Sequence, residues 1–469
     1  MQFNENIEVW NEVTRLISEY FEQNNNKNTP VIEYRSAKDL KSHLNLELSE
    51  NGEGIGVLID EIKTYLKNSV RANHPQYNNQ LQGGANFESL LGELIAFVTN
   101  TTMATFEVAP VASIIEKKLI SKLNDIIGYH EGGGIMLTGG SNANLLALHC
   151  ARNLLLPEAK YKGNQGKSLC TFVSEEAHYS FKKAVMLMGL GLDNLILIKS
   201  DINGKMLASD LEDKIREVKN AGKIPLMIAS TFGTTVKGAF DPIEQIQDLA
   251  EKYQIWHHID GAWGGAAMFS DKLKTHLQEA KRADSFTFDA HKVLGTGIIT
   301  SFLLTKREAS IFAANSGGGS QYIFHHYENS DYDSGRESLQ CGRKVDALKL
   351  WFMWKSRGTK GLGEFVDGQF AKAQYLKNQI IENPRLRLLF EPEFLNVCFQ
   401  VIPKNESLEI NQFNLDLRFK LVKEGKFLIN YSSDSDGTIY FRFVMTNSET
   451  QNEDLDYLIE ELLKLSDEF

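Results

Sequence analysis

The sequence predicts an α/β protein built on a mostly parallel sheet with helices on its faces. In the middle of the chain, short β-rich runs alternate with helical runs, as in SLCTFVS before HYSFKKAVMLMGL and PLMIAST before IEQIQDLAEKY. This alternation is typical of parallel strands joined by covering helices. The apolar content of 42% and charged content of 24% over 469 residues are ordinary for a globular protein with a large core. Ligands of such sheets bind beyond the carboxyl ends of the strands, so residues at strand ends are the candidates for function.

The two ends of the chain have different patterns. Near the N-terminus, Trp10, Val13 and Ile17 fall close to helical spacing and predict amphipathic helix. From Asp346 onward, the helical run ALKLWFMWKSRG is followed by the strand-like runs NVCFQVIP and IYFRFVM and by an acidic helix, which predicts a smaller α+β domain. No Pro-rich or Ser-rich linker separates the parts, so we expect them to pack on one another. The predicted division is an N-terminal helical segment at 1–75, a large domain at 76–345 and a small C-terminal domain at 346–469.

Charge and composition favour a small-molecule partner. The net charge of -11 argues against a nucleic-acid surface, which needs clustered Lys and Arg. The polar N-terminus MQFNENIEVWNEV has no apolar signal region, and no stretch reaches the roughly 18 apolar residues of a membrane span. We therefore expect no membrane association and a cytoplasmic location. The four cysteines lack metal or redox spacing and are expected to be buried free thiols, with no metal site.

Glycines after a short apolar strand predict a phosphate site. In GGGIMLTGGSNANLLALHCARN, Gly139, Gly140, Ser141 and Asn142 open a predicted helix. Glycine lets backbone N–H groups approach an anion, and the start of a helix adds about half a positive charge. A tight turn with Ser141 as helix N-cap explains the same residues equally well.

Other candidate residues end or follow predicted strands. Asp260 closes IWHHID, where a carboxylate beside small residues is placed to pair with the ring nitrogen of a flat ligand. Lys292 follows SFTFDAH, and desolvation there favours a neutral amine that can form a Schiff base. His291 is placed to reach a phosphate, and His178, in SEEAHYSFKKA, is placed to stack on a planar cofactor. Taken one at a time, a solvated acid, a loop lysine and core histidines remain equally good or better explanations.

In order and spacing, these places resemble one family, the group II pyridoxal-phosphate decarboxylases, and most closely its glutamate and cysteine-sulfinate decarboxylase branch. The resemblance runs from about Asn73 to the C-terminus and is carried by HPQYNNQLQGG, NTTMATFEVAPV, SEEAHYSFKKA, GTTVKGAFDPI, HHIDGAWGG, DAHK and SLQCGRKVDALKLWFMWKSRGT. It implies the type I fold of PLP-dependent transferases, pyridoxal 5'-phosphate as cofactor, and removal of the α-carboxylate of an amino acid as CO2. It also implies a homodimer with active sites at the interface, to which the N-terminal segment contributes.

The resemblance implies roles for individual residues. Lys292 would bind the cofactor as a Schiff base, Asp260 would pair with the pyridine nitrogen, and His178 would stack on the ring. The remaining implied contacts are Gly140, Ser141 and His291 to the phosphate, Thr234 and Ala262 near the ring, Arg442 to the substrate α-carboxylate, and Gln80 in the substrate site.

A loop tyrosine is the implied proton donor at Cα of the substrate. Relatives carry it on a mobile loop, which corresponds to residues 315–338 with its Gly317, Gly318 and Gly319. Tyr327 is the candidate acid and Tyr332 competes with it. Without a correctly placed tyrosine, aldehyde formation or abortive transamination would be favoured.

Departures from the family pattern bear on the substrate. Relatives commonly have NPHK where this chain has DAHK, so Asp289 replaces an asparagine near the phosphate. In NTTMATFE the pocket positions are Thr102 and Ala104, and the small Ala104 opens space. Gln80 and the QCGR-containing segment match the branch with acidic substrates, which we expect here: glutamate, aspartate or cysteine sulfinate. An aromatic or diamino acid is the alternative, followed by a transaminase of the same fold and a noncatalytic cofactor-binding scaffold.

Overall fold

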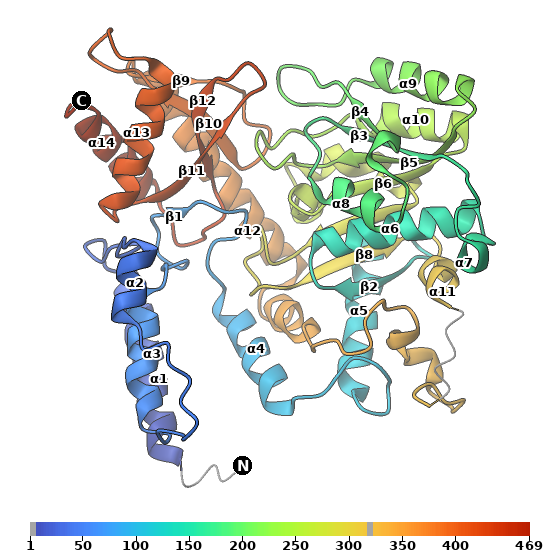
Figure 1. Ribbon diagram of the computed structural model, residues 1–469, viewed down its shortest axis with the longest axis horizontal. Helices are drawn as coiled ribbons and strands as arrows, with labels where there is room; N and C mark the ends of the chain where they lie inside the picture. Colours follow the sequence, from blue (N-terminus) through green and yellow to red (C-terminus); the bar gives the residue numbers. More distant parts are fainter. Residues whose placement is uncertain (1–5, 317–321) are drawn as a thin grey trace. The chain divides into compact units, whose positions relative to one another are not determined.

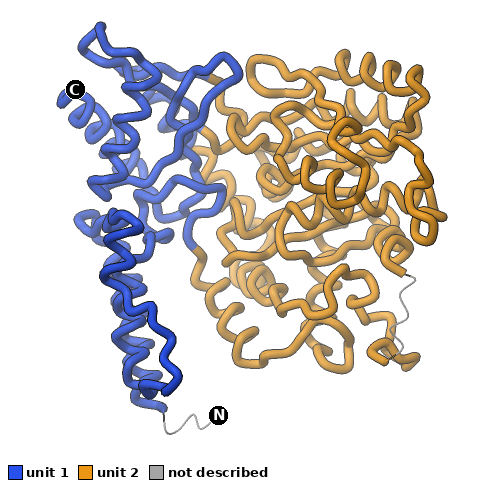
Figure 2. The backbone as a smooth tube through the Cα atoms, in the orientation of Figure 1, with its two compact units in different colours: residues 1–84, 372–389, 397–469 blue, residues 85–371, 390–396 orange. Residues whose placement is uncertain are grey.

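The computed structural model of the chain describes residues 6–316 and 322–469. These residues form two compact units, coloured separately in Figure 2. Unit 1 comprises residues 1–84, 372–389 and 397–469, and unit 2 comprises residues 85–371 and 390–396. The three-part division expected from the sequence stays a prediction.

Unit 2 is built on one seven-stranded sheet in the order β2-β8-β7-β6-β5-β3-β4. The pairs from β7 through β6, β5 and β3 to β4 are parallel, whereas β8 is antiparallel to both β7 and β2. The mostly parallel sheet predicted from the sequence is therefore confirmed. Its strands are β2 (Gly133–Leu137), β3 (Leu169–Ser174), β4 (Leu195–Ile198), β5 (Ile224–Thr231), β6 (Trp256–Gly261), β7 (Ser285–Asp289) and β8 (Ser301–Thr305).

Helices cover both faces of this sheet (Figure 1). Successive residues of a strand point to opposite faces, and Phe172 and Val173 of β3 accordingly belong to two different apolar clusters. One cluster includes Leu146 of α6, and the other includes Ile215 of α9 and Ile246 of α10. The helices are α4 (Phe87–Thr99), α5 (Pro110–Ile127), α6 (Gly140–Leu155), α7 (Ala159–Lys162), α8 (Ser180–Leu187), α9 (Ala208–Asn220), α10 (Ile243–Tyr253) and α11 (Ala309–Asn315), with 3-10 turns at Leu192–Asn194, Gly264–Phe269, Lys274–Arg282, Ser330–Tyr332 and Ser334–Arg336.

Unit 1 joins the two ends of the chain in one sheet, in the order β1-β11-β12-β10-β9. The short N-terminal strand β1 runs parallel to β11, with Tyr77 opposite Leu428. The helix α12 (Ala347–Glu382) leads into this unit and has a kink at Gly358, where φ is +66°. The other elements are α1 (Ile7–Asn24), α2 (Ala37–His43), α3 (Val57–Asn68), β1 (Tyr77–Asn78), β9 (Leu386–Leu388), β10 (Asn396–Val401), α13 (Ile410–Lys423), β11 (Leu428–Ser433), β12 (Ile439–Val444) and α14 (Asn452–Ser466).

The cysteines correct one expectation. Cys150, Cys170 and Cys398 are buried free thiols as predicted, but Cys341 is exposed. It lies on an irregular stretch between Gln340 and Gly342, just before α12, and has no apolar strand or helix around it. In the parts of the chain that the structure describes, no helix combines the length and apolarity needed to cross a membrane.

Candidate functional site

A polar cavity of about 250 Å³ lies at the carboxyl ends of the parallel strands of unit 2. Thr231 ends β5, Asp260 lies next to the end of β6, and Asp289 ends β7. Because parallel strands end at the same edge of a sheet, these three side chains meet there. Of the predicted cofactor-binding residues, this cavity is lined by Gly140, Ser141, His178, Asp260, Ala262, His291 and Lys292.

The glycine turn forms one wall of the cavity. Gly139 has φ of +116°, a conformation that favours glycine, and it precedes the first turn of α6. A Cβ on Gly140 would lie 2.8 Å from Asp289 Oδ2 and 3.0 Å from the Cβ of Ala262, so the position accepts no side chain. The first N–H groups of α6 have no partner within the helix and therefore favour an anion in front of them.

Asp260 is held by two hydrogen bonds and is almost fully buried. Its Oδ1 accepts from the backbone N–H of Ala262 at 3.1 Å. Its Oδ2 accepts from Asn144 Nδ2 at 2.7 Å. Hydrogen bonds to the charged form stabilise a carboxylate in a buried place. The two hydrogen bonds thus fix the orientation of the carboxyl group in the wall of the cavity.

Lys292 lies close to the carboxylate of Asp289 in the wall of the cavity. Its Nζ lies 3.4 Å from Asp289 Oδ2. Next to it, Nδ1 of His291 lies 3.2 Å from both the backbone N and the backbone O of Thr300, so Thr300 fixes the position of the ring in either tautomer. Burial lowers the pKa of His291, so the neutral ring prevails near neutral pH.

His178 lies beyond the end of β3 and also lines the cavity. Its Nδ1 accepts from Ser180 N at 3.3 Å, and its ring centroid is 4.3 Å from that of Tyr179. Burial lowers the pKa of His178, while the charge of Asp260 opposes this shift and that of Lys292 adds to it. A neutral, oriented imidazole results.

Two buried polar atoms in the wall of the cavity have no hydrogen-bond partner among the described residues. They are Thr231 Oγ1 and Asp289 Oδ1, on side chains that are 4% and 2% exposed. Buried polar groups in proteins are nearly always paired. The helix start favours an anionic group, Lys292 can react with a carbonyl group, and Asp289 Oδ1 and Thr231 Oγ1 are left for polar groups of a ligand that can hydrogen-bond to them.

Thr234 lies behind the cavity rather than in its wall. It is fully buried, and its Oγ1 accepts from Ala239 N at 3.0 Å. Thr231 and Thr235 line the cavity instead, and the position of Thr231 at a strand end was a signal that could have identified it.

Asn144, Tyr179 and Trp263 also line the cavity and were not predicted. Asn144 follows Gly140 by four residues on a helix and so shares its face, which was a usable signal. Trp263 follows the strand-end segment of β6, but nothing in its local sequence separates a cavity residue from a core residue.

Gln80 and Arg442 lie together in unit 1. Arg442, on β12, is 7% exposed, and its Nη2 donates to the backbone O of Asn79 at 2.7 Å. Gln80 is exposed, and its Nε2 donates to Asn79 Oδ1 at 3.4 Å. Burial lowers the pKa of Arg442, which stays charged in the physiological range. The two predicted substrate residues thus share one neighbour.

The predicted pocket positions Thr102 and Ala104 bind the end of the predicted loop, residues 315–338, and the residues just after it. Arg343 N donates to Thr102 Oγ1 at 3.1 Å, and Gly335 N donates to the carbonyl of Ala104 at 2.9 Å. Ala104 is 6% exposed. Of the described residues, neither pocket position lines the cavity of Lys292.

Both candidate tyrosines lie on the same segment. Tyr327 Oη donates to Asp333 Oδ1 at 2.6 Å, and the Tyr332 ring lies 5.5 Å from that of Phe106. Neither tyrosine lines the cavity of Lys292 in the described chain. The predicted hinge glycines Gly317, Gly318 and Gly319 lie outside the described residues.

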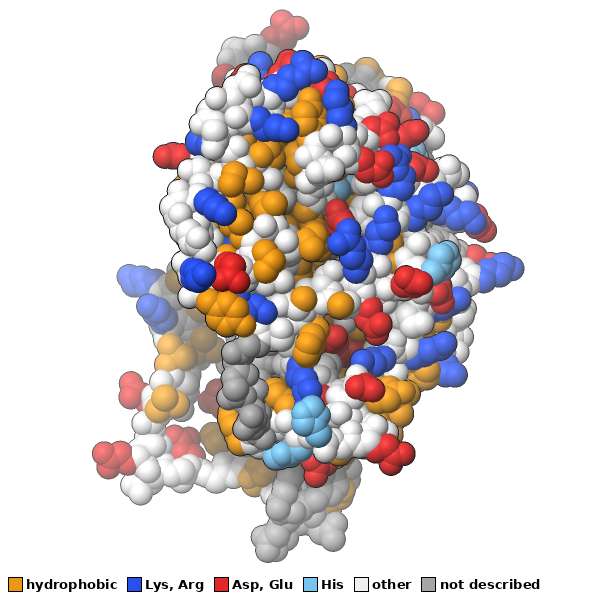
Figure 3. Space-filling model, turned by 90° about the vertical axis from the view of Figure 1, so that its right-hand side faces the viewer, with side chains coloured by type: hydrophobic (Ala, Val, Ile, Leu, Met, Phe, Trp, Pro, Cys, Tyr) orange, Lys and Arg blue, Asp and Glu red, His pale blue; other side chains and the backbone are white. Residues whose placement is uncertain are grey.

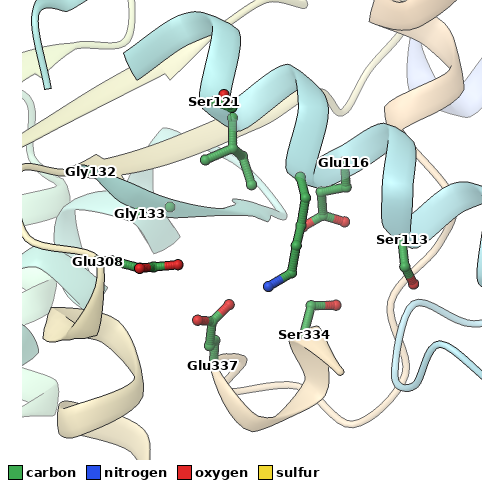
Figure 4. A pocket seen from close by; sticks show the side chains of 11 residues that line it. Ser113, Glu116, Ser121, Gly132, Gly133, Glu308, Ser334 and Glu337 are labelled. Carbon is green, nitrogen blue, oxygen red and sulfur yellow. The ribbon is translucent and has the colours of Figure 1, made fainter. Parts of the chain in front are cut away.

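A second cavity, of about 160 Å³, lies beside this segment, between α5, β2 and the turn at Ser334 (Figure 4). Figure 4 shows the carboxylates of Glu308 and Glu337 pointing into the same space. Burial raises the pKa of Glu337 to about 7. Across residues 6–316 and 322–469, no group of three or more His, Cys, Asp and Glu side chains is placed to hold a metal ion.

The molecular surface has mixed charge where it can be seen. On the face shown in Figure 3, lysines and arginines are interspersed with aspartates and glutamates. That face carries no field of a single sign.

Comparison with known proteins places the chain among related sequences. Residues 37–402 match the family described as the pyridoxal-dependent decarboxylase conserved domain. The chain is 35% identical over 462 residues to human cysteine sulfinic acid decarboxylase, covering 96% of this chain and 94% of the relative. It is 34% identical over 450 residues to acidic amino acid decarboxylase GADL1 of Xenopus tropicalis, covering 93% of this chain and 88% of the relative.

Solved structures agree in fold. The crystal structure of mouse CSAD matches with a TM-score of 0.96 at 32% identity, over 100% of both chains. The tryptophan decarboxylase of Catharanthus roseus, solved with L-tryptophan, matches with a TM-score of 0.90 at 21% identity over 100% of this chain and 99% of that one, a likeness of fold alone.

Proposed function

The chain belongs to the pyridoxal-dependent decarboxylase family, and from this we propose that it removes the α-carboxylate of an acidic L-amino acid as CO2. Decarboxylation with pyridoxal phosphate is the activity of the family, and the acidic side chain of the substrate is the proposed part. The observation that carries it is the similarity, over nearly the whole chain, to relatives named for cysteine sulfinate and acidic amino acids. Glutamate, aspartate and cysteine sulfinate are the candidate substrates.

The residues around the main cavity fit the cofactor. When bound, pyridoxal phosphate supplies a ring that takes up the electron pair left when the carboxylate departs. We assign Lys292 to the covalent bond with its aldehyde and Asp260 to the proton at its ring nitrogen. Gly140, Ser141 and His291 would hold the phosphate, for which α6 offers free N–H groups and His291 offers its imidazole in the wall of the cavity. Ala262 would support the ring from the wall of the cavity, with Thr234 behind that wall and His178 stacked on the ring.

The substrate contacts are assigned to other residues. Arg442 would bind the substrate α-carboxylate, because a buried guanidinium forms two parallel hydrogen bonds to a carboxylate. Gln80, Thr102 and Ala104 would line the pocket for the side chain of the substrate. The small Ala104 favours a longer side chain, and this observation supports an aromatic or diamino acid as the second candidate substrate.

Tyr327 is the proposed acid that protonates the substrate Cα after CO2 has left, with Tyr332 as the competitor. Burial and the hydrogen bond to Asp333 raise the pKa of Tyr327, so the phenol keeps its proton at neutral pH. A protonated phenol on a segment outside the cavity suits a group that approaches only during turnover.

We also propose a homodimer in the cytoplasm. Support for the dimer comes from α4, on which Phe87, Phe97 and Val98 are 69%, 72% and 66% exposed. Monomeric proteins rarely leave such a helix face in water, and homodimers bury one.

The test is CO2 release by cofactor-loaded protein from glutamate, aspartate, cysteine sulfinate, aromatic and diamino acids. Lys292→Ala should abolish release, whereas Lys306→Ala, whose Nζ donates to the carbonyl of Arg282, should leave it unchanged. Release from one acidic member supports the proposal. Release only from an aromatic or diamino acid would replace the proposed substrate class, and release that survives Lys292→Ala would refute the role of Lys292.

A further inference from the structure

Asn144 makes four hydrogen bonds at the centre of unit 2. Its Nδ2 donates to Asp260 Oδ2 at 2.7 Å and to Ser180 Oγ at 3.0 Å. Its Oδ1 accepts from Thr287 Oγ1 at 3.0 Å and pairs with His258 Nε2 at 3.0 Å. A side-chain amide has two N–H donors and two oxygen lone pairs, so every one of them is used.

The direction of these bonds follows from the carboxylate. Asp260 only accepts, so the amide nitrogen of Asn144 must face it and the amide oxygen must face His258, which therefore carries its proton on Nε2. His258 Nδ1 then accepts from the hydroxyl of Ser285 at 2.8 Å. Ser285 Oγ in turn accepts from Trp256 Nε1 at 2.9 Å. Each residue in the series Trp256, Ser285, His258 and Asn144 therefore donates a hydrogen bond to the next, and Asn144 donates to Asp260.

The residues of this hydrogen-bond chain are shielded from water. Ser285 and His258 are fully buried, and Asn144 is 1% exposed. Burial lowers the pKa of His258 to about 4, so the ring is neutral and keeps a single proton at neutral pH. In a medium of low dielectric constant, linked hydrogen bonds strengthen one another, and a missing partner leaves a buried group unsatisfied.

We propose that Asn144 is a positioning residue that fixes the rotation of the Asp260 carboxylate and transmits to it the hydrogen bonds that begin at Trp256. This inference rests on the proposed role of Asp260 toward the ring nitrogen of the cofactor. Asn144 reaches Asp260 from α6, the helix whose start is assigned to the phosphate. One helix thereby sets both ends of the cofactor site.

Two variants of Asn144 test the role. Asn144→Ala should weaken pyridoxal-phosphate binding by about 10- to 100-fold, the range seen when the outer partner of a metal ligand is lost. It should also shift the pH dependence of the cofactor's absorbance. Asn144→Asp keeps the shape but turns an oxygen toward Asp260, so we expect weak binding at pH 8 and partial recovery near pH 6, where the two carboxyls share a proton. The titratable groups around the new carboxyl are Asp260 and His258, with His178, Asp289 and Lys292 on the cavity side.

Asn124→Ala is the matched control. Asn124 is 2% exposed and donates its Nδ2 to the carbonyl of Gly133 at 3.0 Å, outside the lining of the cofactor cavity. It should lower the melting temperature without changing the cofactor affinity or spectrum. Equal affinity and spectra in Asn144→Ala and Asn124→Ala would overturn the proposal.

Further outcomes separate this inference from its premise. If Asn144→Ala does not fold, a flat pH profile of cofactor binding in the isosteric Asn144→Asp would overturn it. Asp260→Ala tests the proposed role of Asp260 toward the ring nitrogen. If this variant kept the cofactor affinity and spectrum of the parent, both that role and the inference about Asn144 would be refuted. A large effect of Asp260→Ala without any effect of the Asn144 variants would refute the inference alone.

Discussion

At the scale of single residues, the position of Asp289 predicts how strongly the protein binds its cofactor. Its carboxylate lines the cofactor cavity, next to Gly140 and 3.4 Å from Lys292 Nζ. A negative carboxylate here would repel a bound phosphate, and two like unit charges 4 Å apart repel by about 1 kcal/mol even with the screening of bulk water. Asp289→Asn should therefore tighten pyridoxal-phosphate binding about fivefold, measured by titrating the apoprotein.

Asp284→Asn is the control for Asp289→Asn. Asp284 directly precedes β7, at the opposite end of the strand from Asp289, and accepts from His257 N at 3.0 Å. It should leave cofactor affinity unchanged. Weaker binding by Asp289→Asn would show that the carboxylate is needed, to hold Lys292 or the cofactor itself.

Residues differ in how far their sequence context reveals them. Lys292, Asp260 and His178 each follow or end a strand, and the edge of a parallel sheet then brings them together without further information. The side-chain amide of Asn144 uses all its hydrogen-bonding groups only because β6, β7 and α8 supply partners that are distant in sequence. Nothing in NANLL specifies those partners.

At the scale of elements, the segment that carries Tyr327 and Tyr332 can be tested by product analysis. If Tyr327 is the acid, Tyr327→Phe should slow amine formation by about 10²- to 10⁴-fold, the usual contribution of a general acid, and raise the share of aldehyde. Tyr332→Phe should behave like the parent. Measured amine and aldehyde per CO2 decide between them.

Loss of the Tyr327 hydrogen bond could itself loosen the segment. Asp333→Asn addresses this, because it weakens the same contact and keeps the phenol. It should retain most amine formation. A defect confined to Tyr332→Phe would transfer the role to Tyr332.

Glu337, in the turn beside the second cavity, should make the free energy of unfolding depend on pH. Burial raises the pKa of Glu337 to about 7 from an ordinary 4.5, so the folded protein holds a proton that the unfolded chain has released between these values. The free energy of unfolding therefore falls as pH rises from about 4.5 to about 7. Glu337→Gln removes this loss, and its stability advantage over the parent should grow by about 1–2 kcal/mol from pH 5.5 to pH 8 in urea unfolding.

Glu308→Gln, on the same cavity, separates a specific effect from a general change of charge. Glu308 is exposed, so this variant should give a smaller dependence on pH. A Glu337→Gln advantage that does not change with pH would contradict the prediction.

Strands were easier to predict than their order. Apolar runs such as FTFD and SFLLT identify β7 and β8 because both faces of the sheet are covered. The antiparallel insertion of β8 between β7 and β2 depends on pairing between distant segments, which no local pattern encodes.

For the whole molecule, the prediction concerns oligomeric state. The parent should have twice the 52.9 kDa mass of one chain in light scattering. Phe97→Glu places a charge on an α4 side chain that is 72% exposed in one chain and should shift the mass toward the monomer. Tyr161→Glu, at a residue of α7 that is 75% exposed, should leave the mass unchanged. A dimer that survives Phe97→Glu would place the interface elsewhere.

The pairing of β1 with β11 has a consequence for synthesis on the ribosome. Tyr77 emerges early, whereas its partner Leu428 emerges near the end of translation. At about 5–20 residues per second, the N-terminal strand waits for tens of seconds while all of unit 2 is made and can fold. During this interval β1 has no strand to pair with, and the nascent chain is then most exposed to chaperones and proteases.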